Sequence, residues 1–520
     1  MAARARNRAA RSCRPAIFGA GLLLALLPAP ATGLNAAAGS AAMTTISVAG
    51  NPYAVAIDPA TDTAYVTDRT AGAVTVIDVA AGRVTATIPV GPYPTAVAVD
   101  PATDVVYVVN DHGDSVSVID GATNAVTQTI TGLAARADAV NGVAVDPVTD
   151  LVYVGVAVGS GEGAVKVIDG ATGTVTHTIT GPGGFPLGVA VDPVTDTVYA
   201  AFGSFLPNTV LVIDGPTNAV STTIALSGPP QGIAADPVTG TFYVANYGET
   251  LSQYSGATDV LAGTVSVGGL PRGVAANPDT GTVYATVTIS STGVSLIDEA
   301  TATVTGRVTV ADPAGPVGVA ADPATDTLVV TAPGVNSVFV IPLHAPVIDS
   351  GGQARFTAGA ASRFTVHATG TPAPAFSQTG RLPAGVTLSR QGILSGTPRP
   401  GTGGIYHITI TAANGVSPAA TQPFTLTVDQ APAFTSANHA VFTAGIRHRY
   451  TVRTSGFPAA RITEQGRLPH GVRFTARQNG TATIAGIPAI SDRGRSFVIR
   501  ITASNGIGRA AVQRFTLRVR

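Results

Sequence analysis

The chain has 520 residues, of which 60 are glycine and 37 proline, while only 12% are charged and none is tryptophan. This composition, rich in valine, isoleucine and threonine, favours short strands and tight turns and excludes a coiled coil or a disordered chain. The net charge is zero, but residues 43–343 carry 6 basic and 26 acidic residues, whereas residues 344–520 carry 19 arginines and 4 acids. After residue 30 no apolar run reaches the roughly 18 residues of a membrane-spanning helix, which excludes a polytopic membrane protein.

The N-terminus has the pattern of a secretory signal peptide. Five arginines precede the apolar residues 17–27, and Ala-Pro-Ala at residues 29–31 is a small-residue cleavage site. We expect residues 1–31 to be removed, residues 32–43 to form a linker, and the mature chain to be secreted, either free or associated with the cell envelope. An uncleaved N-terminal anchor is the alternative. Cys13 is the only cysteine and precedes the apolar stretch, so the mature chain has no disulfide.

Residues 44–343 contain seven copies of one unit with a mean period of 44 residues. Each copy holds strand-like runs separated by turns, and four strands per repeat of this length are typical of a propeller blade. The seventh copy lacks its fourth run, while residues 44–50 match the fourth run of the first copy at residues 86–91. We therefore predict a seven-bladed β-propeller in which the N-terminal strand completes the seventh blade and leaves no open sheet edge.

An Asp-Pro pair, or Asn-Pro in the sixth copy, marks the end of the first strand in each copy, and a tyrosine follows seven residues later in six copies. Asp-Pro-x-Thr forms a turn in which the aspartate binds backbone N–H groups and the proline fixes φ. We expect these residues to be structural turns and not metal or acid–base groups, and the tyrosines to be core. The turn residues are Asp58, Asp100, Asp146, Asp192, Asp236, Asn277 and Asp322.

The motifs Val-Ala-x-Asp-Pro, x-Tyr-Val and Val-Ile-Asp resemble the YVTN-type propeller repeat of bacterial and archaeal surface proteins. The resemblance covers residues 44–342 and implies the propeller fold. It implies little about function, because propellers support many chemistries.

One position of the repeat varies while its neighbours on the same strand hardly change. It lies five residues before the repeat Asp, where loops entering innermost strands surround one end of the axial channel. Variable residues on a constant frame are how repeat proteins build binding surfaces, so we predict a ligand-binding mouth here. The alternative is drift at exposed loop positions. The residues are Tyr53, Thr95, Asn141, Leu187, Gln231, Arg272 and Val317.

Residues 344–430 and 431–520 are two related units that share the motifs Phe-Thr-Ala-Gly and Gly-Arg-Leu-Pro-x-Gly-Val. Their alternating strands predict two Ig-like β-sandwiches. The motifs resemble the Ig-like, cadherin-like modules of bacterial surface proteins, which implies a spacer or adhesive role and allows calcium at the junctions. Calcium needs six to eight oxygens, often from clustered carboxylates, and the few acids of these units are not clustered, so we expect no cofactor.

The second of these units has 14 arginines and 2 acids. It could bind an anionic cell-wall polymer, fold back on the acidic ring, or simply keep the protein soluble. We do not expect nucleic-acid binding, because no recognition motif is present.

No catalytic constellation is visible in the repeats. Their two histidines are expected to lie far apart, His112 in the turn after the second strand of the second copy and His177 on the fourth strand of the third, and no phosphate-binding loop is present. We expect a non-catalytic, monomeric binding or adhesion protein whose propeller recognises an extracellular protein, a glycan or an anionic wall polymer, with the tail as spacer or envelope attachment. The alternative is an extracytoplasmic propeller enzyme, a metal-dependent lyase or lactone hydrolase acting at the axial mouth.

Overall fold

A computed structural model describes residues 43–520, apart from 135–139, 159–160, 204–206 and 290–291. The expected signal peptide and all but the last residue of the expected linker lie outside this part. The described residues form β-strands, and their helical turns are the short 3₁₀ segments η1 (Asp111–Gly113), η2 (Pro333–Val335) and η3 (Ile490–Asp492). The predicted all-β fold class is confirmed.

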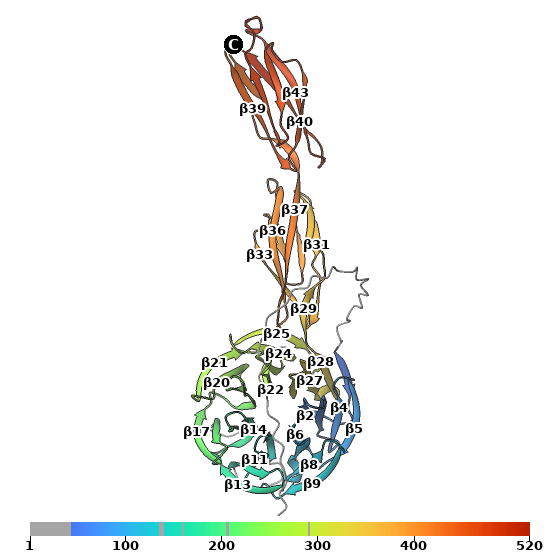
Figure 1. The fold of residues 1–520 in the computed structure, drawn as a ribbon, viewed down its shortest axis with the longest axis vertical. Coiled ribbons are helices and arrows are strands. Elements are labelled where there is room, and N and C mark those ends of the chain that lie inside the picture. The colour runs from blue at the N-terminus through green and yellow to red at the C-terminus, as the bar shows by residue number, and fades with distance from the viewer. Residues whose placement is uncertain (1–42, 135–139, 159–160, 204–206, 290–291) are drawn as a thin grey trace, which may run out of the picture. The chain divides into compact units, whose positions relative to one another are not determined.

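The described strands between residues 44 and 342 form four-stranded antiparallel sheets arranged in a ring, a β-propeller (Figure 1). Seven such sheets lie in this range, and in each one the strands follow from the axis to the rim. The innermost strands are β2 (Pro52–Asp58), β6 (Pro94–Asp100), β10 (Val140–Asp146), β14 (Phe185–Asp192), β18 (Pro230–Asp236), β22 (Leu270–Asn277) and β26 (Val319–Asp322). The second strands are β3 (Thr63–Asp68), β7 (Val105–Asn110), β11 (Leu151–Ala157), β15 (Thr197–Gly203), β19 (Thr241–Asn246), β23 (Thr282–Thr288) and β27 (Thr327–Ala332).

The outer half of each sheet is equally regular. The third strands are β4 (Ala73–Asp78), β8 (Ser115–Asp120), β12 (Gly163–Asp169), β16 (Thr209–Asp214), β20 (Thr250–Ser255), β24 (Gly293–Asp298) and β28 (Ser337–Pro342). The rim strands are β5 (Arg83–Pro89), β9 (Ala125–Thr131), β13 (Thr174–Thr180), β17 (Ala219–Ala225), β21 (Val260–Ser266), β25 (Thr303–Thr309) and β1 (Thr44–Ser47). β1 pairs antiparallel with β28, with Ile46 opposite Val338, so the first strand of the ring completes the last sheet.

Packing between the sheets explains the constant residues of the repeat. The six repeat tyrosines are at most 2% exposed, and Tyr107, for example, belongs to a buried cluster with Val143 and Val152 of the next sheet. The carboxylate of Asp58 accepts hydrogen bonds from the Ala60 N–H (2.9 Å) and the Thr61 hydroxyl (2.8 Å). The same turn recurs at Asp100, Asp146, Asp192 and Asp322. These hydrogen bonds are those of a structural turn.

Two further units follow the ring. The first contains β29 (His344–Ile348), β30 (Gln353–Thr357), β31 (Ser362–Thr365), β32 (Ala368–Thr371), β33 (Ala375–Gly380), β34 (Val386–Leu388), β35 (Ile393–Gly396), β36 (Gly404–Ala413) and β37 (Ala420–Phe434). The second contains β38 (His439–Phe442), β39 (His448–Phe457), β40 (Arg461–Gly466), β41 (Val472–Ala476), β42 (Thr481–Gly486), β43 (Ser496–Ser504) and β44 (Ala511–Val519). The expected boundary at residue 430 falls inside β37, which pairs with β36 along most of its length and with β39 near its end. Each unit has its own apolar core, centred on Phe424 in the first and Phe515 in the second.

Candidate functional site

The innermost strands leave regular pairing at the variable residues. In β6 the register with β7 shifts between Pro94 and Ala96, so Thr95 stands outside the ladder. The same kind of shift isolates Asn141, Leu187 and Gln231, while wider irregularities enclose Tyr53 in β2 and Arg272 in β22. A β-bulge re-aims the side chain of the extra residue, and proline, which has no N–H, suits such a place.

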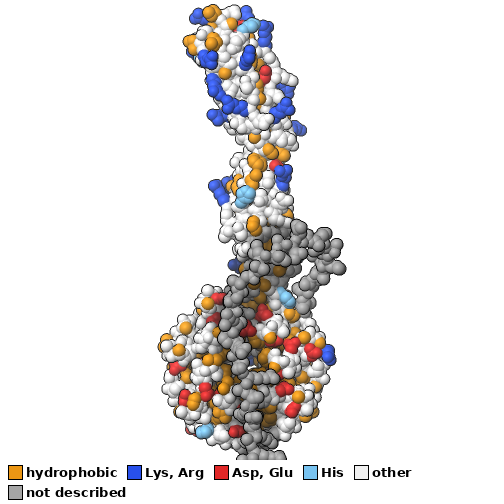
Figure 2. Space-filling view, in the orientation of Figure 1, with side chains coloured by type: hydrophobic (Ala, Val, Ile, Leu, Met, Phe, Trp, Pro, Cys, Tyr) orange, Lys and Arg blue, Asp and Glu red, His pale blue; other side chains and the backbone are white. Residues whose placement is uncertain are grey.

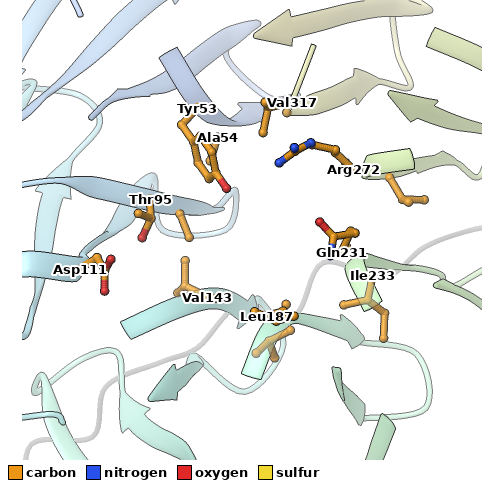
Figure 3. Close-up of a pocket in the computed structure, with 18 of the residues that line it drawn as sticks. Tyr53, Ala54, Thr95, Asp111, Val143, Leu187, Gln231, Ile233, Arg272 and Val317 are labelled. Carbon is orange, nitrogen blue, oxygen red and sulfur yellow. The ribbon is translucent and has the colours of Figure 1, made fainter. Parts of the chain in front are cut away.

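A cavity of about 310 Å³ lies where these bulges meet. Six of the seven predicted residues line it: Tyr53, Thr95, Leu187, Gln231, Arg272 and Val317. Figure 3 shows the side chains of Tyr53, Gln231 and Arg272 pointing toward one central space. Asn141 lies in β10, but its side chain lies outside what the structure describes. The cavity volume is at the lower end of the range of about 300–1,000 Å³ typical of small-molecule sites.

Glycines in the cavity wall let the innermost strands approach each other closely. A Cβ on Gly232 would lie 2.4 Å from the carbonyl oxygen of Arg272, and one on Gly273 would lie 2.5 Å from that of Val317. Neither position can hold a larger side chain without moving backbone. The cavity is therefore framed by backbone, and the variable side chains project from that frame.

A threonine hydroxyl holds one of these bulges and ties it to the next sheet. Thr286 in β23 accepts a hydrogen bond from the Gly273 N–H (2.8 Å) and donates one to the Val317 carbonyl (2.8 Å). Thr286 is fully buried. The backbone that follows Arg272 is thus linked through Thr286 to the neighbouring sheet at Val317.

Arg69 lies against two aromatic rings at the edge of the cavity. Its guanidinium carbon is 4.0 Å from the ring centroid of Tyr53 and 4.1 Å from that of Tyr93, which stacks in turn on His112 at 4.0 Å and 6°. Cation–π contacts contribute from about 0.5 kcal/mol when exposed to about 2 kcal/mol when desolvated. The stack therefore orders Arg69 and connects the first and second sheets at the mouth.

The cavity carries more positive than negative side chains, in contrast to the ring as a whole. Arg69 and Arg272 are its described cations, and Asp111, which is 8% exposed, is its described acid. Figure 3 places Asp111 and Arg272 on different sides of the cavity. Arg272 is exposed, and its side chain makes no hydrogen bond or ion pair with any described residue.

The repeat pattern marks the variable position, and Tyr93 stands on the connection just before it, but neither the place of Arg69 nor the stacking of Tyr93 on His112 could be predicted. These three residues lie outside the strand register that the repeat makes visible. Tyr93 precedes β6 with a φ of 56°, and His112 lies in η1, an exposed turn residue as its sequence context predicts. The available signal is that Tyr53 and Tyr93 each stand beside a proline at the start of an innermost strand.

No group of three or more His, Cys, Asp or Glu side chains in the described ranges is arranged to hold a metal ion. Within the same ranges, no helix has the length and apolar character needed to cross a membrane.

A second charged surface lies on the second Ig-like unit. In the sheet β38-β44-β43-β40, Arg500 stands directly opposite Arg514, and both are exposed (Figure 2 shows the arginines of this unit). Like charges directly opposite each other destabilise a sheet. None of the 14 arginines between residues 431 and 520, all of which are described, forms an ion pair.

Comparison with known proteins agrees with these elements of the fold. Residues 345–429 match the family model described as Putative Ig domain. A solved chain of hydrazine synthase from Kuenenia stuttgartiensis is similar to 59% of this chain, over 98% of its own length, at 20% identity and a TM-score of 0.51. At that identity the similarity concerns the fold alone. No curated protein matches the chain.

Proposed function

We propose that this chain is a secreted or surface-attached binding protein, not an enzyme, whose propeller repeat is of the YVTN type. The propeller mouth would take a ligand from an extracellular protein or glycan, and the Ig-like units would space the propeller from the envelope or attach it there. The observation that carries the proposal is the convergence of six variable side chains on one cavity. Side chains that vary on a repeated frame and share one cavity are what a recognition site requires.

Binding to solubilised cell-wall fragments tests the mouth. The mature chain, residues 32–520, is compared with the triple variant Tyr53→Ala, Gln231→Ala and Arg272→Ala. A control changes the same polar residue types on rim strands of the propeller: Gln128 on β9 and Arg83 on β5. We expect the mouth variant to bind fewer fragments than the control, while the binding that remains is that of the arginine-rich unit and is removed by high salt. Circular dichroism checks that both chains are folded. Equal binding by the two variants would contradict the proposal.

The arginine-rich unit supports the attachment part of the proposal. Two exposed arginines that stand opposite each other without acidic partners repel each other. Binding of an anionic polymer would relieve that repulsion. Such attachment would be salt-sensitive, because exposed charges are screened. Sedimentation of the mature chain with isolated cell walls across a salt series measures it, and salt-independent sedimentation would argue against this attachment.

A further inference from the structure

We propose that the propeller mouth recognises an oxyanion, a carboxylate or phosphate group of its ligand, through the guanidinium groups of Arg69 and Arg272. This inference rests on the proposed function and specifies the chemistry of the same site. Arginine presents paired N–H donors that match the geometry of carboxylate and phosphate oxygens.

The surroundings of Arg69 leave its charge uncompensated. Its Nε is buried and has no hydrogen-bond partner, and its guanidinium rests on the faces of Tyr53 and Tyr93. The adjacent acid, Asp68, accepts a hydrogen bond from the Thr75 hydroxyl (2.5 Å) and forms no ion pair with Arg69. A buried donor without a partner is energetically costly. The two rings hold the cation at the edge of the cavity without accepting its N–H groups in conventional hydrogen bonds.

Arg272 supplies a second cation from another sheet of the same cavity. The bulge in β22 takes it out of the ladder, and Gly273 beside it is fixed by the Thr286 hydroxyl. Figure 3 shows its guanidinium directed toward the space that Tyr53 and Gln231 also face. Asp111, the acid among the described lining residues, is buried and lies on a different side of the cavity from Arg272 in that view.

The two arginines of the cavity stand out because the ring as a whole is acidic. Residues 43–343 contain 26 acids and 6 basic residues, and two of the basic residues that the structure describes, Arg69 and Arg272, line this cavity. The acidic surface of the ring repels long anionic polymers that would lie across it. The cationic mouth attracts an anionic group small enough to fit inside the cavity.

Titration with inorganic phosphate and, separately, with acetate tests the oxyanion site. The mature chain is followed through the arginine Nε–H resonances of ¹⁵N–¹H spectra at constant ionic strength. Arg69→Gln and Arg272→Gln assign the two resonances, and Arg83→Gln on the rim is the control. We expect both resonances to shift saturably with at least one anion, and Arg272→Gln to weaken that affinity by about ten- to a hundredfold. The phosphate and acetate arms distinguish a phosphate-bearing ligand from a carboxylate-bearing one.

Shifts that never saturate, or that affect all arginines alike, mean an adventitious ion only and overturn the inference. Affinity unchanged in both mouth variants overturns it as well. If wall fragments need the mouth residues but neither phosphate nor acetate binds or competes, the oxyanion inference fails and the proposed function stands. If phosphate binds saturably but wall fragments ignore the mouth, the proposed function fails and the oxyanion site stands.

Discussion

The hydroxyl of Thr331 donates a hydrogen bond of 2.7 Å to the backbone carbonyl of Tyr53, 278 residues earlier in the chain. The same hydroxyl accepts the Gly318 N–H at 2.7 Å, and the Thr331 side chain is fully buried. Thr331 thus joins the last sheet of the ring to the first at the wall of the cavity. β1 makes the same connection at the rim, so the ring is closed at both its inner and outer edges.

Thr331→Val keeps the shape of the side chain and removes both hydrogen bonds. Because the Gly318 N–H and the Tyr53 carbonyl then lose a buried partner, we expect the propeller to lose about 1–3 kcal/mol of unfolding free energy. Near-UV circular dichroism during urea unfolding reports on the propeller, since it holds 10 of the 12 tyrosines. Thr129→Val on the exposed rim strand β9 is the control. Equal stability of the two variants would show that the hydroxyl bridge contributes nothing.

Gly318→Ala should be more damaging than its small size suggests. A Cβ at this position would lie 2.6 Å from the Tyr53 carbonyl oxygen, so the backbone of two sheets must move. We expect a loss of about 1–3 kcal/mol in unfolding free energy. Gly248→Ala is the matched control, because a Cβ there meets nothing within 4 Å. A stable Gly318→Ala chain with unchanged ligand binding would argue against the close approach of these strands.

The turns of the ring place carboxyl groups of adjacent sheets together. Burial raises the pKa of Asp196, and the nearby Asp146 carboxylate raises it further; Asp62 is affected in the same way by burial and Asp322. A raised pKa in the folded chain means that the folded state binds more protons than the unfolded state just above pH 4, roughly the pKa of a free aspartate. Stability from these groups is therefore present in acid and lost as pH rises through the raised pKa.

We expect the propeller to unfold at a lower urea concentration at pH 7 than at pH 4. Asp196→Asn should raise stability at pH 7 and flatten the pH dependence, because the amide cannot ionise. Asparagine also tolerates the positive φ of 51° at this position, as Asn218 does at 53° elsewhere in the ring. The midpoint of urea unfolding at several pH values measures the effect. A variant less stable than the parent at pH 7 would mean that the ionised pair is favourable.

Arg500→Gln with Arg514→Gln tests the charged face of the second Ig-like unit. We expect weaker sedimentation with isolated cell walls and a smaller salt dependence, while folding stability stays equal or rises because a like-charge pair is removed. Arg390→Gln with Arg399→Gln in the first unit is the control for lost positive charge. If both double variants lose binding equally, general charge and not this face is responsible.

The fold class could be predicted because the residues that form the turns and the core recur at fixed spacing in the sequence. Asp58 with Thr61 forms a turn, and Tyr65 is buried against the next sheet; both residue types recur at fixed spacing. The variable residues could be placed on the innermost strand for the same reason. The bulges that aim them could not, because a register shift depends on pairing between strands. The contact of Arg69 with Tyr53 and Tyr93 was also hidden, because it joins residues from two sheets that no periodic pattern relates.

Hydrogen–deuterium exchange of residues 32–520, with and without solubilised cell-wall fragments, locates the ligand most directly. We predict slower exchange in peptides that contain residues 52–54, 230–233 and 271–274, and loss of that protection in the Tyr53, Gln231 and Arg272 triple variant. Fragments that bind and protect only residues 431–520, with no change at the mouth, would show that the propeller cavity is not the recognition site.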